Sequence, residues 1–262
     1  MPNTTFSSNQ FGGLWPREYE QALFLSPHHD DICFSIAGTA LNHEAGVLVN
    51  IFTVSEYVAR RITLPTERNE RVEFITSLRA AEDTRFAEAA RLARHDLMLR
   101  EPSLRGFTPF DSRDLSGEVI GVKSVLLSFI ETHFGAGCRR PTAALFCPMG
   151  IGAHRDHLLT LLAVKEMMPF LLSRFDVFFY EELPYASVFP VRNAGIERAL
   201  EILSGFQMRR NRLPLSHAMF ANKLALLAIY DSQFKSTPRA ADFIPADAES
   251  PTPHEAVWRC SA

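Results

Sequence analysis

Up to residue 182, short continuous apolar runs alternate along the chain with longer segments of helical spacing. A run of four to eight apolar residues is typical of a buried strand, and apolar residues three or four positions apart are typical of a helix. The five predicted strands are residues 22–26, 47–55, 96–101, 142–148 and 176–182. The helices predicted between them are residues 34–45, 67–93, 118–134 and 154–172. This alternation predicts βαβ units and a mostly parallel, Rossmann-like sheet.

The chain after residue 182 has a different pattern. Residues 192–204 and 217–234 have the spacing of two further helices. The final stretch is interrupted by prolines, which favour an irregular arm: Pro238, Pro245, Pro251 and Pro253. We therefore predict a single α/β domain over residues 1–235, followed by an irregular C-terminal arm over residues 236–262. Its fold class would be a Rossmann-like three-layer sandwich with a mostly parallel sheet and C-terminal helical additions.

The composition fits one globular domain and argues against nucleic-acid binding. Of the 262 residues, 47% are hydrophobic and 22% are charged, which suits a single core. A net charge of −3 gives no electrostatic footprint for nucleic acid. The tight basic cluster of Arg209, Arg210 and Arg212 is expected to be a solvated surface patch. No stretch approaches the roughly 18 apolar residues of a transmembrane helix.

The four cysteines, among them Cys138 and Cys260, form no C-x-x-C pair. Residues 1–13 lack the basic and apolar regions of a signal peptide. We therefore expect a cytoplasmic protein with reduced thiols. Cys33 and Cys147 lie in apolar runs and are expected to be core residues rather than nucleophiles.

Two polar clusters follow predicted strands. The first comes directly after residues 22–26 and contains His28, His29, Asp30 and Asp31. The second follows residues 142–148 and contains His154, Asp156 and His157. Sites in open α/β sheets form beyond the carboxyl ends of the strands. If the strand order is 3-2-1-4-5, these two strands are neighbours and the clusters meet in space.

The residue types in the two clusters suit a metal site. Catalytic zinc usually takes three protein ligands, often two histidines and a carboxylate, and keeps one position for water. The clusters contain more imidazoles and carboxylates than one ion needs, so the remaining members can serve as base, acid or support. The alternative is that these residues are structural, since a lone histidine is usually a core residue and each aspartate could cap a helix. This alternative is weaker because seven such residues occur at the ends of two strands. The histidines outside the clusters are expected to be structural or on the surface: His43, His95, His133, His217 and His254.

The segments PHHDD (27–31) and HRDH (154–157) resemble the P-H-x-D-D and H-x-D-H motifs of the PIG-L/LmbE-like family of zinc-dependent de-N-acetylases. Further similarity lies in AAEDTRFAEAARL, PMGIGAHRDHLL, YEELPYA and KLALLAIYDSQ. The resemblance covers roughly residues 20–235, and the two motifs are specific only when taken together.

The resemblance implies a role for each motif residue. His28, Asp31 and His157 would bind Zn²⁺, although two histidines and a carboxylate also suit Fe²⁺. Asp30 would be the general base, since a carboxylate that does not bind the metal can take a proton from water. His154 would stabilise the oxyanion or protonate the leaving amine. Asp156 would orient an imidazole from outside the ligand shell.

The chain departs from the family pattern at two positions. His29 stands where Pro is commonest, and it is expected to point away from the metal. Ile32 stands where an acidic residue is frequent, which predicts a drier pocket wall at that point. Neither change removes a ligand.

Three other groups have two interpretations each. Glu181, Glu182 and Tyr185 either bind sugar hydroxyls or belong to a turn stabilised by Pro184. The helix arginines Arg68, Arg71 and Arg79 either reach the substrate or, as we expect, form surface ion pairs. Gly150 and Gly152 are expected to allow a tight loop before His154 and do not form a nucleotide-binding fingerprint.

The function that the resemblance implies is a metal-dependent hydrolase that removes the acetyl group from an N-acetylglucosamine-type amino sugar or its conjugate. One alternative is an amidase acting on another N-acyl conjugate or a secondary-metabolite intermediate. A non-catalytic carbohydrate- or metal-binding protein is disfavoured because the base and all three ligands are present. The expected partner is a small-molecule amino sugar, with no nucleic acid and no membrane span. The apolar segments FPVRN and SHAMFANKLALLAIY leave a homo-oligomer open.

Overall fold

The centre of the molecule is a seven-stranded sheet with the strand order β3-β2-β1-β4-β5-β7-β6. The computed structural model describes residues 19–43, 46–135, 142–248, 250 and 252–262. Neighbouring strands from β3 to β5 are parallel, in the order predicted for the first five strands, and β7 and β6 are antiparallel. The strands are β1 (Gln21–Ser26), β2 (Gly46–Val54), β3 (Ala93–Arg100), β4 (Ala143–Pro148), β5 (Asp176–Tyr180), β6 (Gln207–Pro214) and β7 (His254–Ser261). The predicted α/β class with a mostly parallel sheet is confirmed.

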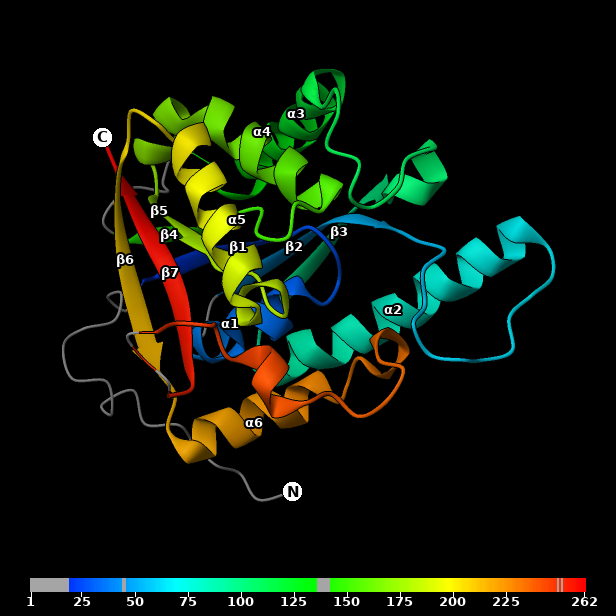
Figure 1. Cartoon of the computed structure of the whole chain (residues 1–262). Helices are drawn as coiled ribbons and strands as arrows, with labels where there is room; N and C mark the ends of the chain where they lie inside the picture. The colour runs from blue at the N-terminus through cyan, green and yellow to red at the C-terminus, as the bar shows by residue number, and fades with distance from the viewer. Residues whose placement is uncertain (1–18, 44–45, 136–141, 249, 251) are drawn as a thin grey trace.

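Helices lie on both faces of this sheet (Figure 1). One face is covered by α3 and α4 and the other by α1, α2 and α6, while α5 packs beside the loop that precedes α4. The helices are α1 (Asp31–Leu41), α2 (Arg68–Ala90), α3 (Ser116–His133), α4 (Arg155–Leu172), α5 (Phe189–Ile202) and α6 (His217–Leu227). The central strands are buried on both faces, which explains their continuous apolar sequences.

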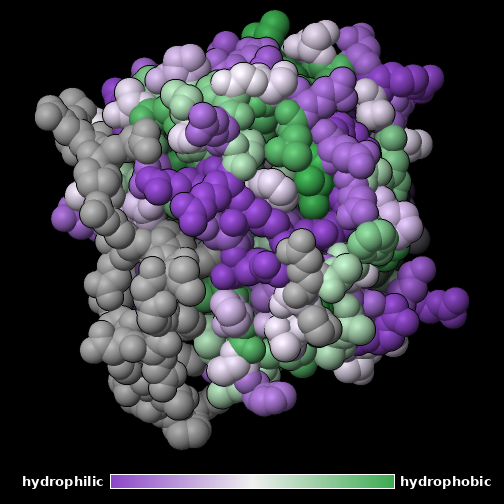
Figure 2. Space-filling model, turned by 60° about the vertical axis from the view of Figure 1, so that its left-hand side comes forward, coloured by the Kyte–Doolittle hydropathy of each residue, from purple (hydrophilic) through white to green (hydrophobic). Residues whose placement is uncertain are grey.

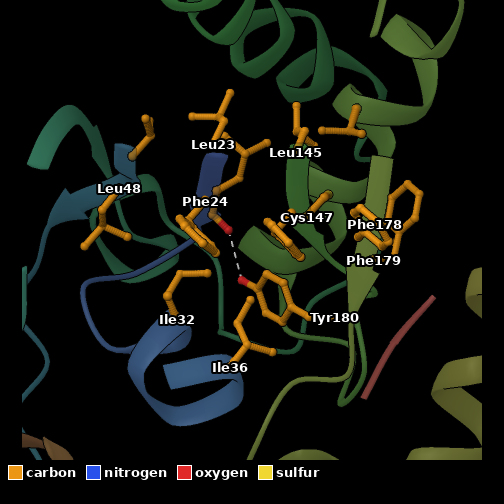
Figure 3. Packing of buried hydrophobic residues seen from close by; sticks show 14 of the residues in the cluster. Leu23, Phe24, Ile32, Ile36, Leu48, Leu145, Cys147, Phe178, Phe179 and Tyr180 are labelled. Atoms are coloured by element: carbon orange, nitrogen blue, oxygen red, sulfur yellow. Dashed lines mark hydrogen bonds between the residues drawn. The ribbon is translucent and has the colours of Figure 1, made fainter. Parts of the chain in front are cut away.

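Aromatic side chains pack across the central strands. The ring of Phe146 on β4 stacks on Phe24 of β1 at 4.8 Å and on Phe178 of β5 at 5.1 Å. On the same face, Ile32 and Ile36 of α1 point at these strands (Figure 3). Because α1 begins directly after the turn that follows β1, this packing fixes the position of the first polar cluster.

The backbone of α1 is interrupted in its middle. Ile36 has φ −134° and ψ 38°, so the helical hydrogen bonds around it are broken. The carbonyl of Ser35 accepts instead from Lys223 Nζ at 2.8 Å. The Glu255 carboxylate accepts from the N–H of Gly38 and from the following N–H, each at 2.8 Å. Lys223 and Glu255 are themselves paired at 3.1 Å, so α6 and β7 satisfy the freed backbone groups of α1.

The expectation of an irregular arm over residues 236–262 is wrong for its last part. Residues 254–261 form β7, which pairs with β5 on one side and β6 on the other. The prolines end at Pro253, and the sequence after them has the β-branched and aromatic content of a buried strand. The strand β6 was also not predicted, because its arginines obscure the apolar alternation.

The basic cluster on β6 is only partly a solvated patch. Figure 2 shows the face on the β6 side of the molecule, with hydrophilic side chains gathered across its middle. Arg209 and Arg212 are exposed, as expected. Arg210 is partly buried, since its Nε contacts Glu181 at 2.7 Å and its Nη1 contacts Asp247 at 2.5 Å.

Other expectations can be compared with the described residues. Cys33 and Cys147 are buried in the core, as predicted, whereas residues 1–13 and Cys138 lie outside the described ranges. Among the described helices, none combines the length and the apolar character needed to cross a membrane.

Candidate active site

The two polar clusters meet at the carboxyl ends of β1 and β4, which are hydrogen-bonded neighbours. The first cluster occupies the turn between β1 and α1, and the second occupies the start of α4. His28 Nδ1 lies 3.3 Å from His157 Nε2, although the two residues are 129 positions apart. The expectation that these clusters adjoin is confirmed.

Three buried side chains bring atoms of ligand type close together. Asp31 lies 3.3 Å from His28 Nδ1 through one oxygen and 3.3 Å from His157 Nε2 through the other. The two nitrogens are also 3.3 Å apart, so each group lies 3.3 Å from the other two, and we call this set the triangle. Tetrahedral zinc with ligand bonds of about 2.0–2.1 Å requires ligand atoms about 3.3 Å apart. The donor set therefore fits a divalent metal.

Carboxylates outside the triangle determine which nitrogen of each imidazole is free. His28 Nε2 is 3.0 Å from Asp156 Oδ2, so it donates its proton there and leaves Nδ1 for a metal. His157 Nδ1 is 3.3 Å from Glu182 Oε1, which leaves Nε2 free in the same way. The Glu182 carboxylate is fixed in turn by the N–H groups of Gly150 at 2.6 Å and Ile151 at 3.2 Å.

The electrostatics of the triangle favour a negative carboxylate beside basic imidazoles. Burial opposes ionisation of Asp31, but His157 and His28 hold its pKa well below its usual range. Burial also opposes protonation of His28, but Asp156 and Asp31 raise its pKa well above the usual value. The site therefore attracts a cation, and a metal ion would take the place of the protons between these groups.

Asp30 lies next to the triangle and faces a buried arginine. Arg79 Nη2 is 3.7 Å from Asp30 Oδ1, and Arg79 Nη1 donates to Glu101 and, at 2.9 Å, to Ser55 Oγ. Burial raises the pKa of Asp30, Arg79 lowers it, and Asp31 raises it again. This places a second carboxylate, held by an arginine, beside the triangle.

The expectation of surface ion pairs is correct for Arg68 and wrong for Arg79. Arg68 pairs with Glu56 on the surface, and Arg71 donates to backbone carbonyls. Arg79 is only 3% exposed. The helical spacing of the sequence could have indicated this burial, because Arg79 falls on the buried face of α2 together with Ile75 and Phe86.

His154 is the residue immediately before α4. Its Nδ1 accepts the N–H of Asp156 at 3.3 Å, so the proton of the neutral ring is on Nε2. Burial, then His28 and His157, lower the pKa of His154 well below its usual value. The ring can therefore donate from Nε2 as a neutral imidazole.

The remaining sequence expectations are resolved by contacts. His29 points away from the triangle and lies 3.3 Å from Asp96 on β3, as expected for a supporting residue. Ile32 is buried in the core and does not form the predicted pocket wall.

The Glu181 carboxylate accepts hydrogen bonds from Arg192, Arg210 and Trp258, so it does not face a substrate. Glu182 supports His157, and Tyr185 lines a cavity above the triangle.

That cavity has a volume of about 600 Å³ and opens over the triangle. Its floor is formed by His28, Asp30, Asp31, His154 and His157, with Arg79 and Glu101 at their side. A cavity of ligand size with convergent polar groups at its floor is typical of a binding or catalytic site.

The fold and the site can be set beside those of known proteins. The chain matches no protein-family model. It is 28% identical over 176 residues to a 2'-N-acetylparomamine deacetylase from Streptomyces fradiae, in a match that covers 63% of this chain. The matched segment spans 58% of that relative, which is less than two thirds of its length.

Solved structures have the same fold. A deacetylase of the teicoplanin biosynthesis pathway, in its bog complex, has a TM-score of 0.66 at 17% identity, over 92% of this chain and 98% of that one. The zinc-inhibited form of teicoplanin deacetylase has a TM-score of 0.61 at 20% identity, with the same coverage. The chain has the fold of these deacetylase structures, and it contains the two motifs on which the resemblance described above rests.

Proposed function

We propose that this protein is a metal-dependent N-deacetylase, which removes the acetyl group from an N-acetylglucosamine-type amino sugar or its conjugate. The observation that supports it most is the triangle of His28, Asp31 and His157, with ligand atoms 3.3 Å apart and a second carboxylate beside it. A purely structural cluster would not need a second carboxylate at the floor of a cavity.

We infer that His28 Nδ1, Asp31 and His157 Nε2 hold the ion, with Zn²⁺ as the expected metal and Fe²⁺ as the alternative. When bound, a divalent ion supplies Lewis acidity for a carbonyl oxygen and lowers the pKa of a water molecule. His154 and Asp30 are the other groups of the floor that can donate or accept a proton.

Asp30 takes the proton of the attacking water, and Arg79 holds the carboxylate in place while it does so. His154 donates its Nε2 proton towards the oxygen that becomes negative in the transition state. Asp156 and Glu182 keep the two imidazoles in the tautomer that leaves their ligand nitrogens free. The C–N bond of the amide breaks as the proton held by Asp30 passes to the leaving nitrogen, so the products are acetate and the free amine.

The test is metal content and acetate release by the purified protein. Metal analysis should find about one divalent ion per chain, and acetate should appear from N-acetylglucosamine or its glycosides. Zinc should be titrated below and above one equivalent, because a related deacetylase is described in a zinc-inhibited form. Stoichiometric metal without acetate release from any N-acetylamino sugar would contradict the substrate class. Absence of bound metal would contradict the site.

A further inference from the structure

The cavity above the triangle has two chemically different halves. Its floor holds the titratable groups described above. Its outer wall is largely apolar, and it combines side chains from α1, from three loops and from the segment that follows α6. The apolar residues of this wall are Phe34, Tyr57, Phe110, Leu183, Pro184, Tyr185, Phe234, Pro238 and Phe243. A cavity of about 600 Å³ holds a ligand of drug size, larger than one monosaccharide.

Residues 230–243 form one side of the outer wall, and their base is fixed. Ser232 donates to Glu82 of α2 through its N–H at 2.8 Å and its hydroxyl at 2.6 Å. Tyr230 donates its hydroxyl to Asp83 at 2.7 Å. Because these acceptors belong to a long helix, the wall is attached to the scaffold before any ligand binds.

The side chains of this wall pack on one another around Phe34. The Phe34 ring stacks on Phe234 at 5.3 Å and meets Phe243 edge-on at 5.4 Å and Tyr230 edge-on at 5.6 Å. Phe34 is four residues after Asp30, so it lies one helical turn above the carboxylate of the floor. The apolar wall thus starts directly next to the reacting groups.

Two aromatic residues at the mouth of the cavity are uncovered. Tyr57 is 54% exposed and Phe110 is 59% exposed, and both line the cavity. Large exposed aromatic side chains at the edge of a pocket are typical of a binding surface.

The charges of the outer half do not suit a polycation. Among the described lining residues, Arg239 and Asp242 pair with each other at 2.6 Å, and Lys235 adds an exposed positive charge. The other lining carboxylates, Asp30, Asp31 and Glu101, belong to the floor with Arg79 and the histidines. An aminoglycoside would place its ammonium groups against an apolar and weakly positive wall.

We infer that the substrate is an N-acetylamino sugar joined to an apolar aglycone, aromatic or alkyl, which lies against the outer wall while the acetamido group reaches the floor. This inference rests on the proposed function and narrows its substrate class. It separates this chain from a deacetylase of aminoglycosides, whose substrate is polar and cationic.

The experiment compares kcat/KM of the metal-loaded protein for four substrates. These are free N-acetylglucosamine, its phenyl glycoside, its octyl glycoside and 2'-N-acetylparomamine. We expect at least one apolar glycoside to exceed free N-acetylglucosamine by 10-fold or more, and to exceed 2'-N-acetylparomamine as well. The phenyl and octyl arms decide whether the wall prefers an aromatic or an alkyl group. Equal kcat/KM for the free sugar and the glycosides, or a preference for 2'-N-acetylparomamine, would overturn the inference and leave the proposed function standing. Failure to release acetate from any of the four substrates would contradict the proposed function itself.

Variants at the mouth test the wall directly. Phe110→Ser and Tyr57→Ser should reduce the ratio of kcat/KM for the apolar glycoside over the free sugar by about 5-fold or more. The loss should appear mainly in KM, because these side chains would contact the aglycone and not the acetamido group. Phe74→Ser is the matched control, since Phe74 is an exposed aromatic on α2 outside the cavity. An unchanged ratio in both mouth variants would overturn the assignment of this wall.

Discussion

At the residue scale, the tautomers of His28 and His157 each depend on one carboxylate. Asp156 fixes His28 and Glu182 fixes His157, and each carboxylate is itself held by further donors. The first of these supports was predicted from the motif. Glu182 was not, because its own segment suggested either a sugar ligand or a turn residue. Nothing in the spacing of residues 157 and 182 indicates that they meet.

We predict that Glu182→Gln lowers metal affinity by about 10–100-fold. The amide oxygen can still accept the N–H of Gly150, but the negative charge that supports His157 is lost. Affinity would be measured by competition with a chromogenic chelator. Glu56→Gln, at an exposed ion pair with Arg68, is the control and should leave affinity unchanged. Equal affinity in Glu182→Gln and the parent protein would refute this role.

The carboxylate beside the metal ligands gives a second prediction. Asp30→Asn should reduce kcat by about 10²–10⁴-fold, as expected when a general base is removed. Metal content should be unchanged, because the three ligand atoms remain. Asp114→Asn, in an exposed loop, should behave like the parent protein. If Asp30→Asn lost its metal together with its activity, Asp30 would have to be counted as a ligand.

The residue that replaces the family's usual proline now has a physical explanation. His29 lies 3.3 Å from Asp96 and 3.0 Å from Arg94, both on β3. Asp83 of α2 accepts from the same arginine at 2.7 Å. The side chain therefore connects the turn after β1 with β3 and α2. These partners are 54 to 67 positions away, so no local pattern could predict them.

At the scale of elements, the interrupted helix α1 depends on two distant charges. Lys223 and Glu255 are each at most 1% exposed, and they satisfy the backbone groups freed at Ile36. The start of α1 bears Asp31, so this support also determines where a proposed metal ligand lies. The sequence predicted a helix here but gave no sign of its interruption.

We expect Glu255→Gln to reduce the free energy of unfolding by about 3–5 kcal/mol, the cost of leaving a buried charge unpaired. The unpaired group would be the ammonium of Lys223. Urea denaturation followed by circular dichroism would measure the change. Glu166→Gln, at an exposed pair with Lys123, should lose less than about 1 kcal/mol. A loss in Glu255→Gln no larger than in this control would argue against the network.

The predicted ranges were most accurate for the elements with strong local patterns, such as strands buried on both faces. The first five strands and the long helices have strong local patterns, and they lie within a few residues of their predicted ranges. The strands β6 and β7 were missed because arginines obscure the apolar alternation of β6 and because β7 follows a stretch rich in proline. β7 begins 74 positions after the end of β5, and Trp258 of β7 is paired with Phe179 of β5. Periodicity describes one segment at a time and contains no information on such partners.

At the scale of the whole molecule, one buried histidine makes stability depend on pH. Burial lowers the pKa of His43 to about 4, and its ring contacts Tyr19, Phe24 and Phe146. In the unfolded chain the same group titrates near 6.5. The unfolded state therefore binds more protons between these values, and stability is lost as pH falls through this window.

For this group alone, the free energy of unfolding should fall by about 2 kcal/mol from pH 7 to pH 5. His43→Phe should remove this part of the pH dependence, because the ring remains aromatic and no longer titrates. Thermal or urea unfolding at the two pH values measures it. His217→Gln, at an exposed histidine, is the control. The same pH dependence in His43→Phe and the parent protein would rule out this source of acid sensitivity.

The chain between β6 and β7, residues 215–253, contains α6 and the segment that forms one side of the outer cavity wall. Its two ends are held together because β6 and β7 are paired, with Leu213 near the end of β6 opposite Glu255 near the start of β7. The proposed metal ligands come from entirely different parts of the sequence. In the proposed enzyme, recognition of the aglycone and cleavage of the amide are thus encoded separately. Such a protein can acquire a new preference by exchanging one clamped insertion, in evolution or by grafting, while the residues that perform the chemistry stay as they are.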